Sequence, residues 1–179
     1  MYANAYAECR DQLKTNPSGG VPYTPILPLL YGLQASLTML QEEGMDKVWA
    51  RHHRLATGVR TEVGAWGLNL LCTTPRWHSD ALTVIETPQG VNSNLIVKNA
   101  YAKYNLSLGL GLSEVDGKVF RIGHLGNMDE IMCLSSLAGT EMALLDAGVA
   151  ITPGSGVGAA VKYFQETSSP IRTRESLLA

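Results

Sequence analysis

The apolar residues of this chain change their spacing once, at about residue 67. Between residues 26 and 63 they recur every three or four positions, which is the repeat of one face of an α-helix. Beyond residue 67 they form short runs rich in Val, Leu and Ile, separated by turn-forming residues and by further stretches of helical spacing. The sequence therefore predicts two long helices, followed by short strands and helices.

The two long helices are predicted over residues 24–43 and 45–66. Thr24 is a capping residue, and Pro25 after it suits the first helical position. One apolar stripe of the first helix comprises Ile26, Leu29, Leu30, Leu33, Leu37 and Leu40. The stripe of the second comprises Val48, His52, Leu55, Val59 and Val63. Glycines follow both helices, as stop signals do. A shorter helix is predicted over residues 1–13.

The rest of the chain alternates strands with helices. Strands are predicted over residues 68–72, 82–86, 106–110 and 119–122, and helices over 92–104 and 127–147. Asn92 caps the first of these helices, and Asn127 with Glu130 forms a capping box on the second. From about residue 151 the chain is rich in Gly, Ser, Thr and Pro, which predicts a flexible tail with one possible helix at 157–165. The connections are too short for parallel crossovers, so the fold class is α+β, with a small, mostly antiparallel sheet.

Composition excludes several classes of protein. Of the 179 residues, 45% are hydrophobic and 17% are charged, which argues against disorder. A net charge of −2 argues against a nucleic-acid partner, and no run approaches the roughly 18 apolar residues of a membrane span. Cys9, Cys72 and Cys133 form no CxxC pair and are interpreted as reduced thiols, and the N-terminus lacks a signal-peptide pattern. We expect a cytoplasmic protein.

Three short motifs carry little chemistry. The dinucleotide fingerprint that Gly109 and Gly111 suggest fails at Glu114, where its third glycine belongs. His52 and His53 are adjacent on a helix, so their rings diverge and do not readily share a metal ion. A run around Ser155 does not have the spacing of a hydrolase nucleophile.

Arg121 is the residue that most invites a functional interpretation. It lies in an apolar strand pattern, on the face opposite Phe120 and Ile122 and shared with Val119. A guanidinium keeps its charge, so it must meet a carboxylate, a phosphate or water. The pattern alone leaves open an internal ion pair, an exposed edge position, or a clamp on a small carboxylate ligand.

Seven motifs then appear in a characteristic order. They are YTP at 23–25, LYGL at 30–33, EGM at 43–45, WARHHRL at 49–55, AWGL at 65–68, YNLSLG at 104–109 and GKVFRIGHLG at 117–126. Together they resemble the C-terminal half of the class V, fold-type I aminotransferases, most of all the serine–glyoxylate and alanine–glyoxylate enzymes. The resemblance runs from about Pro22 to Gly158.

The resemblance implies a pyridoxal-phosphate enzyme that transfers an amino group from L-serine or L-alanine to glyoxylate, giving glycine, in glyoxylate metabolism such as photorespiration. It also implies a homodimer. The six lysines are Lys14, Lys47, Lys98, Lys103, Lys118 and Lys162. None stands in the family's Ser-Gln-Lys context, so the Schiff-base lysine is absent and the chain alone is expected to be inactive. Residues 1–44 would be the end of the large domain, with the dimer-contact segment and linking helix, and residues 45–179 the small domain.

Two site residues carry over by position. Arg121 matches the arginine that holds the substrate carboxylate. Thr24 matches the threonine that reaches the cofactor phosphate of the partner subunit, although Val21 stands where an aromatic residue commonly precedes it. Plant relatives are peroxisomal, but residues 175–179 are not an SKL-like terminus. The alternatives are an α+β module that binds a small carboxylate without chemistry, and a protein-interaction domain.

Overall fold

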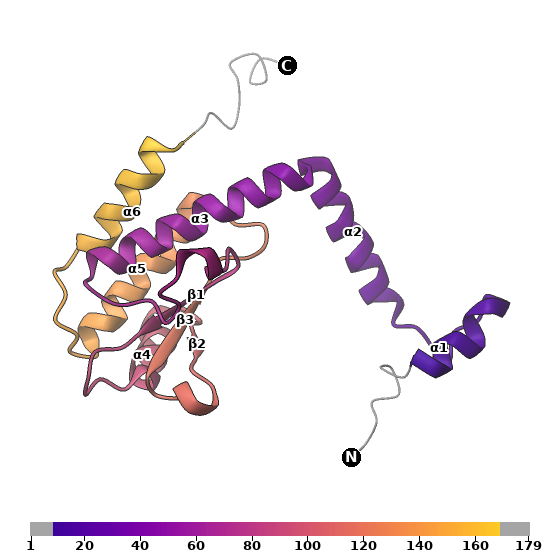
Figure 1. The fold of residues 1–179 in the computed structure, drawn as a ribbon, viewed down its shortest axis with the longest axis horizontal. Coiled ribbons are helices and arrows are strands. Elements are labelled where there is room, and N and C mark those ends of the chain that lie inside the picture. Colours follow the sequence, from indigo (N-terminus) through magenta and orange to yellow (C-terminus); the bar gives the residue numbers. More distant parts are fainter. Residues whose placement is uncertain (1–8, 169–179) are drawn as a thin grey trace, which may run out of the picture. The chain divides into compact units, whose positions relative to one another are not determined.

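The computed structural model describes residues 9–168 and divides the chain into two compact units, Met1–Val48 and Trp49–Ala179 (Figure 1). The first unit contains α1 (Cys9–Thr15), the 3-10 turn η2 (Asn16–Ser18), α2 (Leu27–Glu43) and the start of α3 (Met45–Ala65). From the sequence, the boundary between the two domains was expected after residue 44. Residues 1–8 of the predicted N-terminal helix lie outside the described residues.

Helix α2 begins later than its sequence predicts. Its N-cap is Ile26, without a side-chain hydrogen bond, and Pro28 lies in its first turn. The predicted start, with Thr24 as cap and Pro25 first, is wrong. It would put Pro28 at the fourth helical position, where a backbone N–H is needed and the ring clashes with the preceding turn. The helix ends as predicted at Gly44, whose φ of 85° suits glycine.

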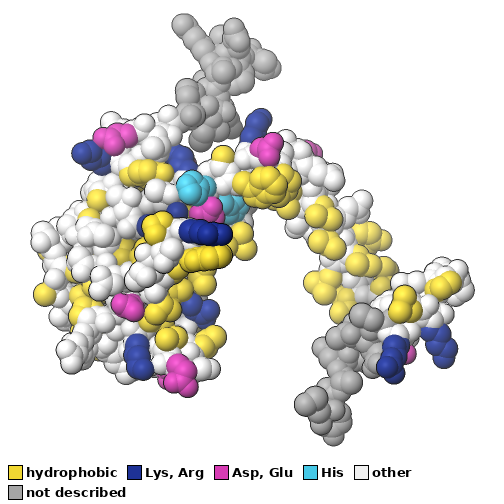
Figure 2. Space-filling model, viewed as in Figure 1, with side chains coloured by type: hydrophobic (Ala, Val, Ile, Leu, Met, Phe, Trp, Pro, Cys, Tyr) yellow, Lys and Arg dark blue, Asp and Glu magenta, His cyan; other side chains and the backbone are white. Residues whose placement is uncertain are grey.

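The apolar stripe of α2 is exposed. None of the helix's residues is buried, and the side chains of Leu29 and Leu33 are 66% and 55% exposed. Figure 2 shows hydrophobic side chains over this helix. The pattern therefore predicted the helix correctly, but the described residues leave this stripe uncovered.

The second unit is built on a three-stranded antiparallel sheet, in the order β1-β3-β2. The strands are β1 (Leu82–Glu86), β2 (Gly109–Leu110) and β3 (Val119–Gly123). The helices are the remainder of α3, α4 (Ser93–Tyr104), α5 (Glu130–Asp146) and α6 (Ser155–Glu166), with short 3-10 turns η3 (Pro75–Trp77) and η4 (Ser113–Val115). The predicted α+β class with an antiparallel sheet is confirmed.

One face of the sheet carries the core. Helices α3 to α6 surround the sheet (Figure 1), and their apolar side chains form one buried cluster with those of this face. The central members are Leu55, Val59, Val63, Ile85, Ile96, Phe120, Ile122, Leu137, Leu144 and Phe164. The opposite face carries the other residues of β1 and β3, which include Val84 and Arg121.

Two predicted strands are shorter than expected. Residues 68–72 contribute only a single bridge, between Leu70 and Ile85. At one end Leu68 still donates its N–H to Val63 of α3, and at the other the chain turns into η3. The strand predicted over 106–110 is reduced to Gly109–Leu110.

One further expectation about a helix end is wrong. Helix α5 is capped by Asp129, which accepts a 2.8 Å hydrogen bond from the Met132 N–H, and not by Asn127. Arg51 of α3 donates to the carbonyls of Gly126 and Met128, at 2.8 and 3.1 Å. These hydrogen bonds hold residues 126–128 as a loop, so α5 does not begin until Glu130.

The possible helix at 157–165 is confirmed as α6, but the flexible tail expected from about residue 151 is wrong where the structure describes it. Helix α6 packs on the core, with Gly156, Ala160 and Phe164 buried. The Glu141 carboxylate accepts hydrogen bonds from the N–H groups of residues 154, 156 and 157. The small residues thus permit close docking instead of flexibility. Residues 169–179 lie outside the described part. Within residues 9–168, no helix has the length and apolar character needed to cross a membrane.

Candidate functional site

Arg121 lies in the middle of the sheet. Strand β3 pairs with β1 on one side and β2 on the other, so the position is not at an edge. The residues opposite Arg121 are Val84 on β1 and Gly109 on β2. Side chains directly opposite one another project from the same face, so Arg121 shares the less buried face of the sheet with Val84. The exposed-edge alternative is therefore excluded.

The guanidinium of Arg121 has no partner among residues 9–168. Its Nε is buried without a hydrogen-bond partner, and no ion pair involves it. Two other arginines of the same unit do have acidic partners: Arg54 pairs with Glu130, and Arg60 approaches Asp80 at 3.5 Å. Nothing in the described part of the chain supplies the internal ion pair that the sequence left open. The planar fork remains available for an anion, which it is shaped to bind through two parallel hydrogen bonds.

The segment that follows Arg121 is held by helix α3. The Gly126 N–H donates to His52 Nε2 at 3.1 Å, and Arg51 binds carbonyls of the same loop. His53 instead faces Asp80, with Nδ1 3.1 Å from Oδ2. The adjacent histidines thus serve two different loops, as their divergence on a helix predicts.

His124 connects β3 to β1 two residues beyond Ile122. Its Nε2 lies 2.9 Å from Thr83 Oγ1 and its Nδ1 lies 3.0 Å from the Asp80 carbonyl oxygen. Burial lowers the pKa of His124, so a neutral ring bridges these two groups. The described residues contain no group of three potential metal ligands. His124 therefore ties the end of β3 to β1, and His52 holds the loop that follows it.

A buried carboxyl pair lies away from Arg121, beneath α6. Burial, reinforced by repulsion from Glu141, raises the pKa of Glu62 to about 9. Burial also acts to raise the pKa of Glu141, but hydrogen bonds from Trp66 Nε1 and from backbone N–H groups lower it overall. Glu62 was not among the candidate residues predicted from the sequence, although a carboxyl group next to Val63 in the apolar stripe of α3 indicated a buried acid. Glu141 holds the start of α6 through hydrogen bonds to its backbone N–H groups, and Glu62 lies against Gly156 of the same helix, so the pair has a structural role.

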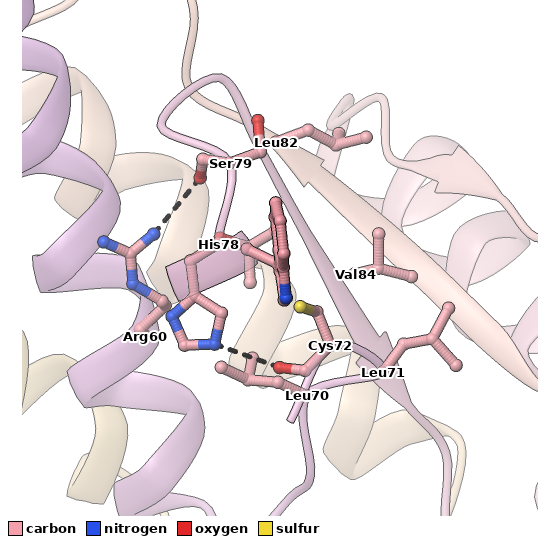
Figure 3. A pocket seen from close by; sticks show the side chains of 10 residues that line it. Arg60, Leu70, Leu71, Cys72, His78, Ser79, Leu82 and Val84 are labelled. Atoms are coloured by element: carbon pink, nitrogen blue, oxygen red, sulfur yellow. Dashed lines mark hydrogen bonds between the residues drawn. The ribbon is translucent and has the colours of Figure 1, made fainter. Parts of the chain in front are cut away.

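One cavity of about 300 Å³ opens on the β1 side of the sheet (Figure 3). Its apolar wall includes Val84, which is also the cross-strand neighbour of Arg121. Arg60 contributes a charge, but it donates to the Ser79 carbonyl at 3.2 Å, as Figure 3 shows. His78 lies 3.0 Å from the Cys72 carbonyl oxygen. Arg60 and His78 are thus both engaged with backbone carbonyls, and Arg121 remains the better candidate for binding a carboxylate.

Thr24, the other predicted site residue, belongs to the first unit. It is exposed in the segment before α2, and its hydroxyl makes no hydrogen bond within residues 9–168. A free hydroxyl fits the predicted contact with a phosphate. The lysines do not fit a cofactor-bearing role. All six are exposed, Lys103 pairs with Asp146 at 2.9 Å, and Lys118 donates to the Glu114 carbonyl.

Comparisons with known proteins agree with one another. No protein-family model matches the sequence. The chain is 52% identical over 164 residues to a serine–glyoxylate aminotransferase of Methylorubrum extorquens, which covers 92% of this chain and 41% of that enzyme. It is 44% identical over 164 residues to an L-aspartate–glyoxylate aminotransferase of Paracoccus denitrificans, with the same two coverages of 92% and 41%.

A solved structure has the same fold. The pyridoxamine–pyruvate aminotransferase of Mesorhizobium loti matches with a TM-score of 0.78 and 31% identity, over 83% of this chain and 38% of that chain. The chain thus spans about two fifths of the length of the curated relatives it matches, and it corresponds to their C-terminal portion.

Proposed function

We infer that this chain forms the C-terminal portion of a pyridoxal-phosphate-dependent aminotransferase that transfers the amino group of L-serine or L-alanine to glyoxylate. The observation that carries the proposal is the unpartnered guanidinium of Arg121 on the central strand, in a chain related to glyoxylate aminotransferases over 92% of its length. The cofactor-bearing lysine is expected from residues outside this chain.

Pyridoxal phosphate, when bound, supplies the electron sink for chemistry at the substrate Cα. Arg121 would bind the substrate carboxylate through its fork and so fix the position of Cα. The amino donor and glyoxylate both carry this carboxylate, so one arginine would serve both halves of the transfer. The hydroxyl of Thr24 would donate a hydrogen bond to the cofactor phosphate.

The amino donor is the finer part of the proposal. The two relatives described above differ in the donor that their names print, serine or aspartate, and share glyoxylate as the second substrate. Glyoxylate is therefore the better supported substrate, and we propose serine or alanine as donor on the motif resemblance. We also propose a homodimer, with the exposed stripe of α2 in its contact region, and a cytoplasmic role in glyoxylate metabolism of the photorespiratory type.

A chimaeric enzyme tests the function. Residues 1–179 would replace the matching C-terminal segment of the Methylorubrum extorquens enzyme, and transamination from L-serine, L-alanine and L-aspartate to glyoxylate would be measured. We expect glycine formation that requires added pyridoxal phosphate. A folded chimaera that binds the cofactor but forms no glycine from any donor would contradict the proposal and favour a non-catalytic module.

A further inference from the structure

Gly109 occupies the position beside Arg121 where a side chain has no room. The register pairs Gly109 on β2 with Arg121 on β3, and Val84 on β1 completes the row. A Cβ built on Gly109 would lie 2.9 Å from Arg121 Nε, 3.0 Å from its Cβ and 3.3 Å from its Cζ. The arginine side chain therefore lies across the backbone of Gly109.

Backbone conformation does not explain this glycine. Eight glycines of the described chain have positive φ angles, and Gly109 is not among them. Any L-amino acid therefore tolerates its φ without the left-handed strain that selects glycine elsewhere. A glycine inside a strand also weakens the strand. What the missing side chain provides at this position is space for the guanidinium.

The buried Nε shows where that space is used. Nε of Arg121 is covered and has no hydrogen-bond partner, whereas the residue as a whole is partly exposed. The terminal nitrogens are not among the buried, unpartnered atoms. Because the Nε edge of the guanidinium lies against β2, a carboxylate would approach Arg121 at its two Nη groups.

We propose that Gly109 is a positioning residue for Arg121: it lets the guanidinium lie flat on β2 and so presents the two Nη groups, end-on, to the substrate carboxylate. This rests on the proposed carboxylate-binding role of Arg121. A side chain at residue 109 pushes the guanidinium off β2, and the carboxylate then loses one of its two charge-assisted hydrogen bonds.

The test uses Gly109→Ala in the chimaeric enzyme, with Gly158→Ala as the matched control. Gly158 lies on α6, and a Cβ there meets nothing within 4 Å. Binding of L-serine, and of ethanolamine as the amine without a carboxylate, is followed by the change in cofactor absorbance. We expect Gly109→Ala to weaken serine binding about tenfold or more, the effect of one charged hydrogen bond, and ethanolamine binding less than about twofold. Gly158→Ala should alter neither ligand's binding.

Arg121→Lys separates this inference from the proposed function. If Arg121→Lys weakens serine and ethanolamine binding equally, the carboxylate role itself fails. If Arg121→Lys is selective for serine and Gly109→Ala is not, the function stands and the role of Gly109 is overturned. Equal losses for both ligands in Gly109→Ala would show a merely structural glycine.

A second measurement does not depend on whether Gly109→Ala folds. In the unsubstituted, ¹⁵N-labelled chain, the Nε–H signal of Arg121, assigned by its loss in Arg121→Lys, should exchange with water at least about tenfold more slowly than that of the surface residue Arg76, because β2 covers it. Equal exchange rates for the two arginines would overturn the end-on arrangement.

Discussion

Replacing Glu62 by glutamine should stabilise the second unit at neutral pH, although the Glu62 side chain is fully buried in the folded protein. Both carboxylate oxygens of Glu62 are buried without hydrogen-bond partners, and its pKa is raised from 4.5 to about 9. The folded state therefore holds a proton that the unfolded state releases above pH 4.5. Because the folded state binds more protons, the free energy of unfolding falls as pH rises from about 4.5 to about 9.

The magnitude follows from the two pKa values. Each pH unit inside this window costs about 1.4 kcal/mol, so at pH 7 the loss is about 3 kcal/mol relative to a group that stays neutral. Glutamine has the shape of the protonated acid and does not titrate. Glu62→Gln should therefore raise the free energy of unfolding by about 3 kcal/mol at pH 7 and by about zero at pH 4.

Urea unfolding at a series of pH values, followed by circular dichroism, measures this difference, because titrating groups that do not interact with Glu62 cancel between the two proteins. Glu141→Gln is the matched control with the opposite sign. The pKa of Glu141 is lowered and its carboxylate accepts hydrogen bonds from Trp66 and three backbone N–H groups, so the substitution should destabilise at neutral pH and progressively less as the pH falls through the pKa of Glu141. If Glu62→Gln is no more stable than the parent at pH 7 and shows the same pH slope, Glu62 is not a buried neutral acid.

Three further outcomes are expected. A methyl group added to α3 in Gly58→Ala overlaps the Phe164 ring, so this substitution should lower the free energy of unfolding by about 1–3 kcal/mol. In Gly64→Ala, on the same helix, the methyl group meets nothing, and the free energy of unfolding should rise by about 0.5–1 kcal/mol. Equal effects of the two substitutions in urea unfolding would contradict the tight docking of α6. The chain alone, with pyridoxal phosphate added, should catalyse no serine–glyoxylate transamination above a free-cofactor blank, because its lysines are exposed and paired elsewhere or lack the family context. Hydrogen exchange on a monomer should find residues 26–43 poorly protected, and strong protection throughout would contradict the uncovered stripe.

Local patterns predicted those elements whose limits are set by local forces. Strand β1 and helix α4 begin and end as expected, because Asn92 caps its helix through the Asn94 N–H and the strand alternates buried and half-buried residues. The prediction of element limits failed where a residue distant in the sequence determines the limit. The start of α6 depends on the Glu141 carboxylate, thirteen residues from Gly154, and no pattern within residues 151–166 reveals it.

For the candidate site too, the sequence predicted the local features and the structure was needed for the long-range ones. The alternation around Arg121 predicted a cation on a strand, and the motif order predicted its family, which the relatives confirm. Whether that cation has a partner depends on which strands flank it and on where the other charged side chains lie. The sequence therefore left the ion pair, the edge and the clamp as alternatives, and only the central position of β3 and the unpartnered Nε distinguish them.

The exposed apolar stripe of α2 and the unpartnered guanidinium of Arg121 both lack a binding partner within the described residues. Each large aliphatic side chain left in water forgoes about 1.5–3 kcal/mol of burial, and a partly buried cation without an anion loses its solvation without compensation. Residues 9–168 supply neither the cover for the stripe nor the anion. A chain that spans 41% of its relative is expected to obtain both from outside itself, an apolar surface for α2 and a carboxylate for Arg121. The two deficits differ in chemistry, and the proposed function accordingly assigns them different partners: a protein surface for the helix and a small, acidic substrate for the strand.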